Sequence, residues 1–225
     1  MELVSHIHRV DGVQGNCYLV DRDGLVLIDT GLVRNSKKIL ACIRDELDRD
    51  PRDLELIIIT HSHADHTGNV AELRRATGAR VAVHEADAEY LAGRAAMPPL
   101  TGLRGRLLAH LLSLWPAEPV EPDLLLHDGD RLSGFECIHT PGHTPGSVCL
   151  YDLTLRAVFC GDALLTKNGT VRGPPPSATP DMAEAMRSVR RVSGLDYDIL
   201  LSGHGTPLLK EASQRVNDFM TGLGG

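Results

Sequence analysis

The 225-residue sequence lacks any run of about 20 apolar residues, the length that a membrane-spanning helix requires. Its opening residues, MELVSHIHRV, also lack the basic, apolar and small-residue regions of a secretory signal. Positive charge is scarce, because 23 lysines and arginines face 30 acidic residues and the formal net charge is −7. A broad basic field for holding nucleic acid is therefore missing. We expect a cytoplasmic protein that acts on a small molecule, without a nucleic-acid or membrane partner.

Cysteine is also sparse, and its spacing excludes two common uses. The five cysteines are odd in number, and no pair has the CxxC spacing of a zinc or redox motif. We therefore expect buried, reduced thiols that serve neither as nucleophiles nor as metal ligands. These residues are Cys17, Cys42, Cys137, Cys149 and Cys160.

The apolar segments occur in an order that repeats once along the chain. In the first half, a strand-like run leads to Asp29, a helical pattern follows, and the buried-strand pattern LIIIT stops at His61. In the second half, a strand-like run leads to Asp162, a helical pattern begins near Asp181, and the run ILL precedes the loop with His204. Two such halves predict an α/β fold, a four-layer αββα sandwich whose strand-end loops meet along one edge.

A single domain over residues 1–225 is expected, with an insertion at residues 93–122 between the halves. Several prolines flank the insertion, and the apolar stretch Leu103 to Leu114 within it has a helical pattern. This stretch could cover a substrate site as a lid or form the surface of a homodimer, and the sequence leaves both roles open.

The densest group of chemically active side chains is the segment HSHADH, which directly follows the LIIIT run. His61 and His63 are two positions apart and can point the same way, whereas Asp65 and His66 follow one turn later. One loop can thus serve two neighbouring metal sites. Imidazole and carboxylate ligands without thiolates suit zinc, with iron or manganese as alternatives.

This segment and three later ones resemble the successive motifs of the metallo-β-lactamase superfamily. The motifs are THSHADHTG at 60–68, TPGHTPGS at 140–147, GDAL at 161–164 and SGHG at 202–205. The resemblance implies that His61, His63 and His143 bind a first metal and that Asp65, His66 and His204 bind a second. It also implies that Asp162 bridges the two metals, and that Asp29 of the VLIDTG segment supports a ligand histidine by hydrogen bonding.

Two divalent metal ions can share one water molecule and lower its pKa toward neutrality, which favours hydrolysis by a metal-bridging hydroxide. In such a site Asp65 is expected to orient the nucleophile as well as bind metal. His84 ends a further strand-like segment at 80–84 and is a candidate for lining the substrate pocket.

Elimination narrows the substrate to a lactone, ester or thioester. Asp162 stands where the commonest zinc β-lactamases have cysteine, and the 21 residues after His204 leave no room for the helical domain of the otherwise similar glyoxalase II. A phosphodiesterase is disfavoured by the acidic balance. The alternative from another class is a persulfide dioxygenase with a single iron, although the stretch after Asp162 does not match that branch.

Overall fold

The computed structural model describes residues 1–22, 24–99, 102, 105 and 116–222, which form two compact units. The first unit comprises Met1–Met97 with Ala109–Leu126, and the second comprises Pro98–Leu108 with His127–Gly225, in each case as far as they are described. Apart from Gly105, the helix expected over Leu103 to Leu114 lies outside the described residues. Among the described residues, no helix is both long and apolar enough to cross a membrane.

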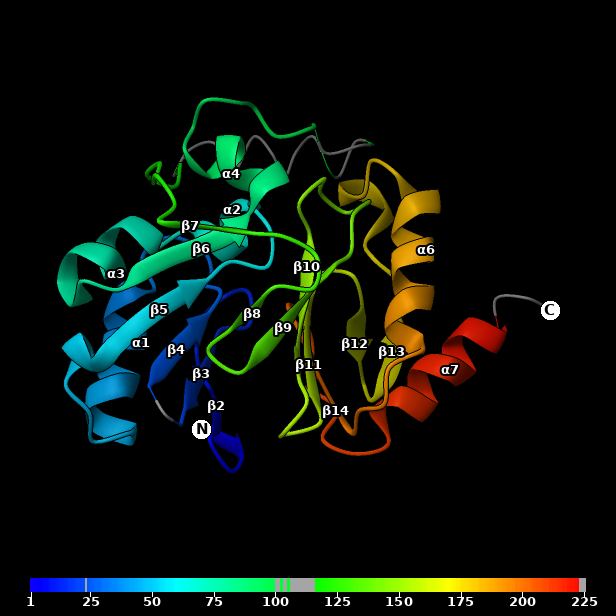
Figure 1. The fold of residues 1–225 in the computed structure, drawn as a ribbon, viewed down its shortest axis with the longest axis horizontal. Coiled ribbons are helices and arrows are strands. Elements are labelled where there is room, and N and C mark those ends of the chain that lie inside the picture. Colours follow the sequence, from blue (N-terminus) through cyan, green and yellow to red (C-terminus); the bar gives the residue numbers. More distant parts are fainter. Residues whose placement is uncertain (23, 100–101, 103–104, 106–115, 223–225) are drawn as a thin grey trace. The chain divides into compact units, whose positions relative to one another are not determined.

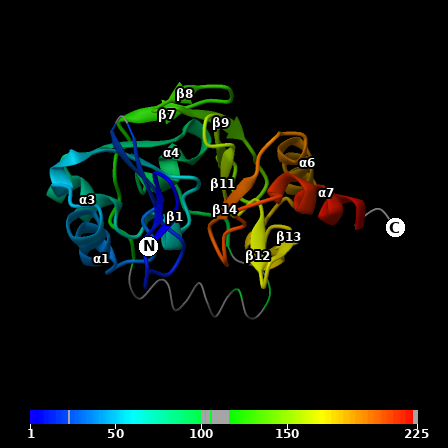
Figure 2. The ribbon, with the colours of Figure 1, turned by 90° about the horizontal axis from the view of Figure 1, so that it is seen from below.

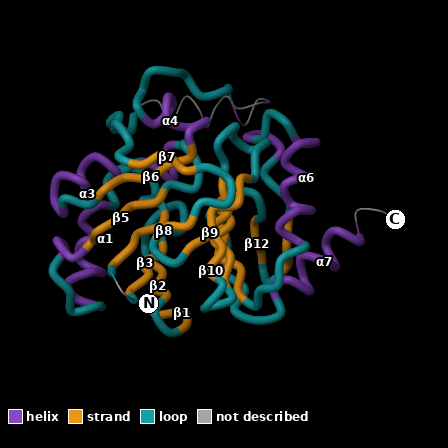
Figure 3. Tube along the Cα trace, in the orientation of Figure 1, coloured by secondary structure: helices purple, strands orange, loops and turns teal. Residues whose placement is uncertain are grey.

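The first unit is built on a seven-stranded sheet with the order β1-β2-β3-β4-β5-β6-β7. Its first four strands pair antiparallel, whereas β4 to β7 pair parallel. Figure 3 shows these strands crossing this unit one after another. Their bounds are β1 Glu2–Val4, β2 Ile7–Arg9, β3 Tyr18–Asp21, β4 Leu25–Ile28, β5 Leu54–Ile58, β6 Arg80–His84 and β7 Leu124–Leu126.

The helices of the first unit lie in the segments that connect its parallel strands (Figure 1). Alternate strand residues such as Leu25, Leu27 and Ile57 share one buried apolar cluster with Ile39 and Leu73 of the helices. This period of two is the pattern that places one strand face against a helical layer. The bounds are α1 Ser36–Ala41, the π-helical η1 Cys42–Glu46, the 3₁₀ turn η2 Pro51–Asp53, α2 Ala64–Thr67, α3 Val70–Thr77 and α4 Glu85–Leu91.

The start of α1 is capped by a residue that is distant in sequence. Asn35 occupies the N-cap position, but its side chain makes no capping hydrogen bond. Instead, the Asn69 Oδ1 atom accepts from the backbone N–H groups of Asn35 and Ser36, at 2.9 and 3.1 Å. The helix that follows HSHADH thus anchors the helix that follows Asp29, a contact between residues more than 30 positions apart.

The second unit has a five-stranded sheet with the order β14-β11-β10-β9-β8. Here β8 to β11 pair antiparallel, and β14 joins β11 in parallel. This is the sequence of pairings that β1 to β5 show in the first unit, as the repeated apolar pattern predicted. The strands are β8 Arg131–Leu132, β9 Phe135–His139, β10 Val148–Asp152, β11 Ala157–Gly161 and β14 Ile199–Ser202.

Two helices pack on one face of this second sheet. Val189 of α6 and Val216 of α7 share a buried cluster with Cys149, Val158 and Leu200 of the strands. Figure 2 shows α6 and α7 side by side, and the two helices are in contact. The helices are α6 Met182–Ser193 and α7 Ala212–Gly222, with the 3₁₀ turn η3 Pro176–Ala178 before α6.

A hairpin in the second unit was not predicted from the sequence. Strands β12 Leu165–Lys167 and β13 Thr170–Arg172 pair antiparallel around Asn168 and Gly169. Both turn residues have positive φ, 51° and 76°. An Asn-Gly pair is the usual signal for a two-residue hairpin with this geometry. The sequence therefore contained the signal, in the segment directly after the Asp162 loop.

All five cysteines are buried and none forms a disulfide, as predicted. Burial raises the pKa of the Cys149 thiol to about 12. Burial likewise raises the pKa of Cys17 well above its usual value, with a smaller contribution from the Asp29 carboxylate. These thiols stay protonated at neutral pH, so they act as small apolar side chains of the core.

Candidate metal ligands in each unit

In the first unit, the HSHADH segment leaves β5 and turns into the short helix α2. Candidate ligand atoms of His61 and His63 lie within 4.8 Å of each other, as do those of His61 and His66, and a carboxylate oxygen of Asp65 lies within the same distance of a His66 ring nitrogen. The ring centroids of His61 and His66 are 4.0 Å apart. His61 and His66 are buried, whereas His63 and Asp65 are partly exposed. The four side chains therefore gather their donor atoms at the end of one strand.

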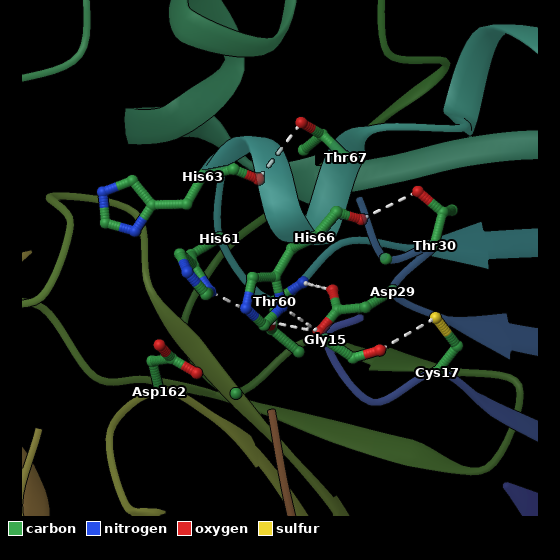
Figure 4. A network of polar contacts seen from close by, with 12 residues as sticks. Gly15, Cys17, Asp29, Thr30, Thr60, His61, His63, His66, Thr67 and Asp162 are labelled. Atoms are coloured by element: carbon green, nitrogen blue, oxygen red, sulfur yellow. Dashed lines mark hydrogen bonds and ion pairs between the residues drawn. The ribbon is translucent and has the colours of Figure 1, made fainter. Parts of the chain in front are cut away.

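Asp29 connects the end of β4 to this cluster (Figure 4). Its Oδ2 atom accepts from His66 Nδ1 at 2.8 Å, and its Oδ1 atom accepts from the backbone N–H of Thr60 at 2.8 Å. Both Asp29 and His66 are almost fully buried. Because a carboxylate accepts, the His66 proton sits on Nδ1 and the lone pair on Nε2.

Thr60 links Asp29 to the second histidine, His61. The Thr60 hydroxyl donates to Asp29 Oδ2 at 2.8 Å, and its oxygen lies 3.1 Å from His61 Nδ1. A hydroxyl has a single proton, so Thr60 accepts from His61 Nδ1–H. Asp29 thereby sets the tautomer of His66 directly and that of His61 through Thr60. In both rings Nε2 keeps the lone pair that a metal ligand needs.

Asp87 of α4 holds the backbone between His61 and His63. Its Oδ2 atom accepts from the Ser62 N–H at 2.8 Å, and the Ser62 hydroxyl donates to the Asp87 carbonyl at 3.1 Å. Asp87 has no exposed surface. The sequence reading missed both Asp87 and Thr60, although a buried polar residue beside a ligand histidine is a signal that could have pointed to Thr60.

In the second unit, three candidate ligands come from three loops. Asp162 follows β11, His204 follows β14, and His143 follows β9. The Asp162 Oδ2 atom lies 3.7 Å from His143 Nε2 and 3.5 Å from His204 Nε2. Asp162 and His143 are buried, and His204 is partly exposed. One carboxylate oxygen thus faces the Nε2 atoms of two histidines.

The loops with Asp162 and His204 are tied together by the backbone. The N–H of Gly203 donates to the Gly161 carbonyl at 2.7 Å, which continues the parallel pairing of β11 and β14 into the loops. Gly205 has a φ of +95°, and a Cβ atom there would lie 1.7 Å from the Thr166 carbonyl oxygen. Only glycine fits this position, so the His204 loop packs directly on the start of the β12–β13 hairpin.

His84 is buried at the end of β6. Its Nδ1 atom accepts from the Ala86 N–H at 3.2 Å, so the ring caps the N-terminus of α4. The structure therefore places His84 at the helix that carries Asp87. This contact gives His84 a role in supporting α4, beside the pocket role proposed from the sequence.

The donor atoms in the two units suit divalent cations of intermediate softness. The candidate ligands are imidazole nitrogens and carboxylate oxygens, and the Nδ1 contacts of His61 and His66 prepare Nε2 for coordination. Zinc, iron and manganese all accept such donors. Cys160 is absent from the clusters of candidate ligands among the described residues, and its buried Sγ atom donates to the Leu164 carbonyl at 3.3 Å.

Comparisons with known proteins identify the family of this chain. Residues 10–204 match the metallo-beta-lactamase superfamily. "Probable metallo-hydrolase YflN" of Bacillus subtilis is 28% identical over 92% of this chain and 86% of its own length. "Acyl-coenzyme A thioesterase MBLAC2" of Bos taurus is 34% identical over 68% of this chain and 59% of its own length. A crystal structure of TTHA1623 in a di-iron-bound form is 31% identical, covers 95% of this chain and 98% of that chain, and has a TM-score of 0.72.

The fold and the comparisons define an α/β metallo-hydrolase. The chain belongs to the metallo-β-lactamase superfamily, since the family match spans most of its length. The fold class predicted from the sequence is confirmed, and so is the prediction of an enzyme of the hydrolase class.

Proposed function

We propose that this chain is a binuclear metal-dependent hydrolase of acyl substrates. The observation that carries the proposal is the preparation of the ligand histidines: His61 and His66 each present Nε2 because Nδ1 is held by Thr60 or Asp29. Family membership supports the same reading.

The proposed ligands follow the family resemblance position by position. The first metal would be bound by His61, His63 and His143. The second would be bound by Asp65, His66 and His204, and both would be bound by Asp162. Bound divalent cations would lower the pKa of water and polarise the scissile acyl oxygen of the substrate.

Asp65 has a second proposed role in the reaction. Its carboxylate is partly exposed at the start of α2, and its ligand oxygen lies within 4.8 Å of a His66 ligand nitrogen. A carboxylate in this position accepts a hydrogen bond from the attacking water and so orients the lone pair of the water oxygen toward the acyl carbon. Asp29 holds His66 in place during this step, since it accepts from His66 Nδ1.

Among lactones, esters and thioesters, we propose thioesters as the first class to test. The support is the 34% identity to a protein named as an acyl-coenzyme A thioesterase. We also propose zinc as the metal, with iron as the alternative that the di-iron form of TTHA1623 raises. Imidazole and carboxylate donors accept either metal.

The experiment is a substrate panel assayed with metal-depleted and metal-restored protein. Acyl thioesters, aryl esters and lactones should be hydrolysed only after zinc, iron or manganese is restored, and a phosphodiester should not. His143→Ala should abolish the activity. His127→Ala is the matched control, because His127 is an exposed histidine of the same unit that contacts Asp130.

Two outcomes would contradict the proposal. Equal turnover by metal-depleted and metal-restored protein would remove the metals from the mechanism. Oxygen uptake on glutathione persulfide by protein with a single iron, without acyl hydrolysis, would favour the persulfide dioxygenase.

A further inference from the structure

The proline-rich segment 173–176 of the second unit has no role in the proposed reaction, yet it lies beside a candidate ligand. Pro175 caps the 3₁₀ turn η3, and its carbonyl oxygen accepts from the Ala178 N–H at 3.0 Å. The same carbonyl accepts from the Thr179 hydroxyl at 2.8 Å. Pro175 is followed by Pro176, which restricts the ψ angle of Pro175 to extended values, and its ψ of 118° sets the direction of this carbonyl.

Thr179 in turn contacts His143. The Thr179 hydroxyl oxygen lies 3.1 Å from His143 Nδ1, and both side chains are buried. Because the only hydroxyl proton of Thr179 is donated to the Pro175 carbonyl, its oxygen can only accept from the imidazole. The contact therefore requires a proton on His143 Nδ1, which places the lone pair on Nε2.

The loop that leads to His143 is held by the residues that follow this proline-rich segment. The Asp181 N–H donates to the Gly142 carbonyl at 3.2 Å, and the Ser188 hydroxyl donates to the Pro141 carbonyl at 2.8 Å. Gly142 has a φ of +122°, and a Cβ atom there would lie 2.2 Å from the Ala185 backbone nitrogen. Residues 175–188 thus fix the loop on which His143 stands as well as the orientation of its ring.

We propose that Thr179, oriented by Pro175, is a positioning residue that holds His143 in the Nδ1–H tautomer with Nε2 ready to bind metal. The competing contact of Nε2 with Asp162 is 3.7 Å long, beyond hydrogen-bond range. The Nδ1 contact at 3.1 Å is within that range. Thr60 makes the equivalent contact to His61 in the first unit, but there a carboxylate rather than a peptide carbonyl receives the hydroxyl proton.

This inference rests on the proposed role of His143 as a ligand, but its first test needs no metal. Nitrogen-15 NMR of metal-free protein with labelled histidine, at a pH where imidazole is neutral, reports which ring nitrogen carries the proton. The His143 signals are assigned by their loss in His143→Gln. We expect the Nδ1–H form in the wild type and in Thr179→Ser, and a shift toward the Nε2–H form in Thr179→Val. An Nε2–H form in the wild type would overturn the inference even if acyl hydrolysis were confirmed.

The second test measures affinity for zinc by competition with a chelator. Thr179→Val should bind the zinc ion that His143 coordinates about 10- to 100-fold more weakly, which is the usual effect of losing a partner that orients a ligand. Thr179→Ser, which keeps the hydroxyl, should bind within a few-fold of the wild type. Equal weakening in both variants would show that zinc affinity falls even when the hydroxyl is kept, so that packing at residue 179 rather than the hydroxyl controls it, and would also overturn the inference.

Discussion

Asp29 Oδ2 lies 2.8 Å from His66 Nδ1, and neither side chain has appreciable contact with solvent. Asp29 follows β4, and His66 stands in α2 after the neighbouring parallel strand β5. Parallel strands bring their carboxyl ends to one edge of a sheet, so residues 37 positions apart meet there. The sheet topology thus produces the contact that prepares a ligand.

Replacement of Asp29 by Asn should weaken metal binding about 10- to 100-fold. An amide has only one acceptor oxygen, so it cannot accept from Thr60 N–H, the Thr60 hydroxyl and His66 Nδ1 as the carboxylate does. Competition with a chelator measures the loss. Asp45→Asn is the matched control, because Asp45 is an exposed residue of the same unit beside Arg44. Similar affinity in both variants would contradict the role assigned to Asp29.

Asp162→Ala should abolish hydrolysis while leaving the fold intact. The Asp162 oxygen faces the Nε2 atoms of His143 and His204, and the variant removes the group that is proposed to serve both metals. Circular dichroism checks the fold, and initial rates on an acyl thioester check the activity. Unchanged turnover would refute the bridging assignment.

Gly142→Ala should lower the free energy of unfolding by more than about 2 kcal/mol. The added methyl group would meet the Ala185 backbone nitrogen at 2.2 Å, and the backbone has a φ of +122°. Gly129→Ala separates the two causes, because Gly129 has a φ of +83° with nothing within 4 Å of the added Cβ. Urea unfolding should show a loss of about 1 kcal/mol for the Gly129 variant. Equal losses in both variants would show that the tight contact with α6 contributes nothing.

The buried thiols should make stability fall at alkaline pH. Burial raises the pKa of Cys149 to about 12, whereas the pKa of a cysteine thiol in the unfolded chain is about 8.5. Below the pKa of the unfolded chain, the Cys149 thiol is protonated in both the folded and the unfolded state, and its contribution to stability is fully present. Between the two values only the unfolded state loses its proton, so this thiol lowers stability by about 1.4 kcal/mol per pH unit.

The measurement is urea unfolding of the wild type and Cys149→Ala at about pH 8 and about pH 10. The stability advantage of the wild type over the variant should shrink by about 2 kcal/mol between these pH values. An advantage that stays constant would mean that the Cys149 thiol ionises in the folded protein as easily as in water.

Local patterns in the sequence predicted much of the fold because they report on local structure. The helix at 70–77 ends at Gly78, which adopts a left-handed conformation, and the strand at 80–84 has the predicted bounds. The start of α1 depends on a distant residue, because the Asn69 side chain rather than that of the N-cap residue Asn35 supplies the acceptor. That acceptor comes from a distant segment, which a local pattern does not reveal.

The residues of the candidate site likewise divide into those that local motifs predict and those that only the folded chain reveals. The motifs named seven possible ligands, because ligand-type residues cluster visibly along the sequence. Among the groups that orient those ligands, Asp29 was predicted, but the two threonines were not: Thr60 is held by Asp29, 31 residues away, and Thr179 acts on His143 from 36 residues away. A threonine at a strand or helix end is common, and only its partner in the folded chain gives it a role.

The proposal that this chain binds two metals for hydrolysis can be tested by titrating metal-free protein with zinc. Two equivalents of zinc should bind per chain, and acyl hydrolysis should reach its maximum only as the second equivalent binds. Saturation of both binding and activity at one equivalent, or no tight binding of zinc, iron or manganese, would contradict it.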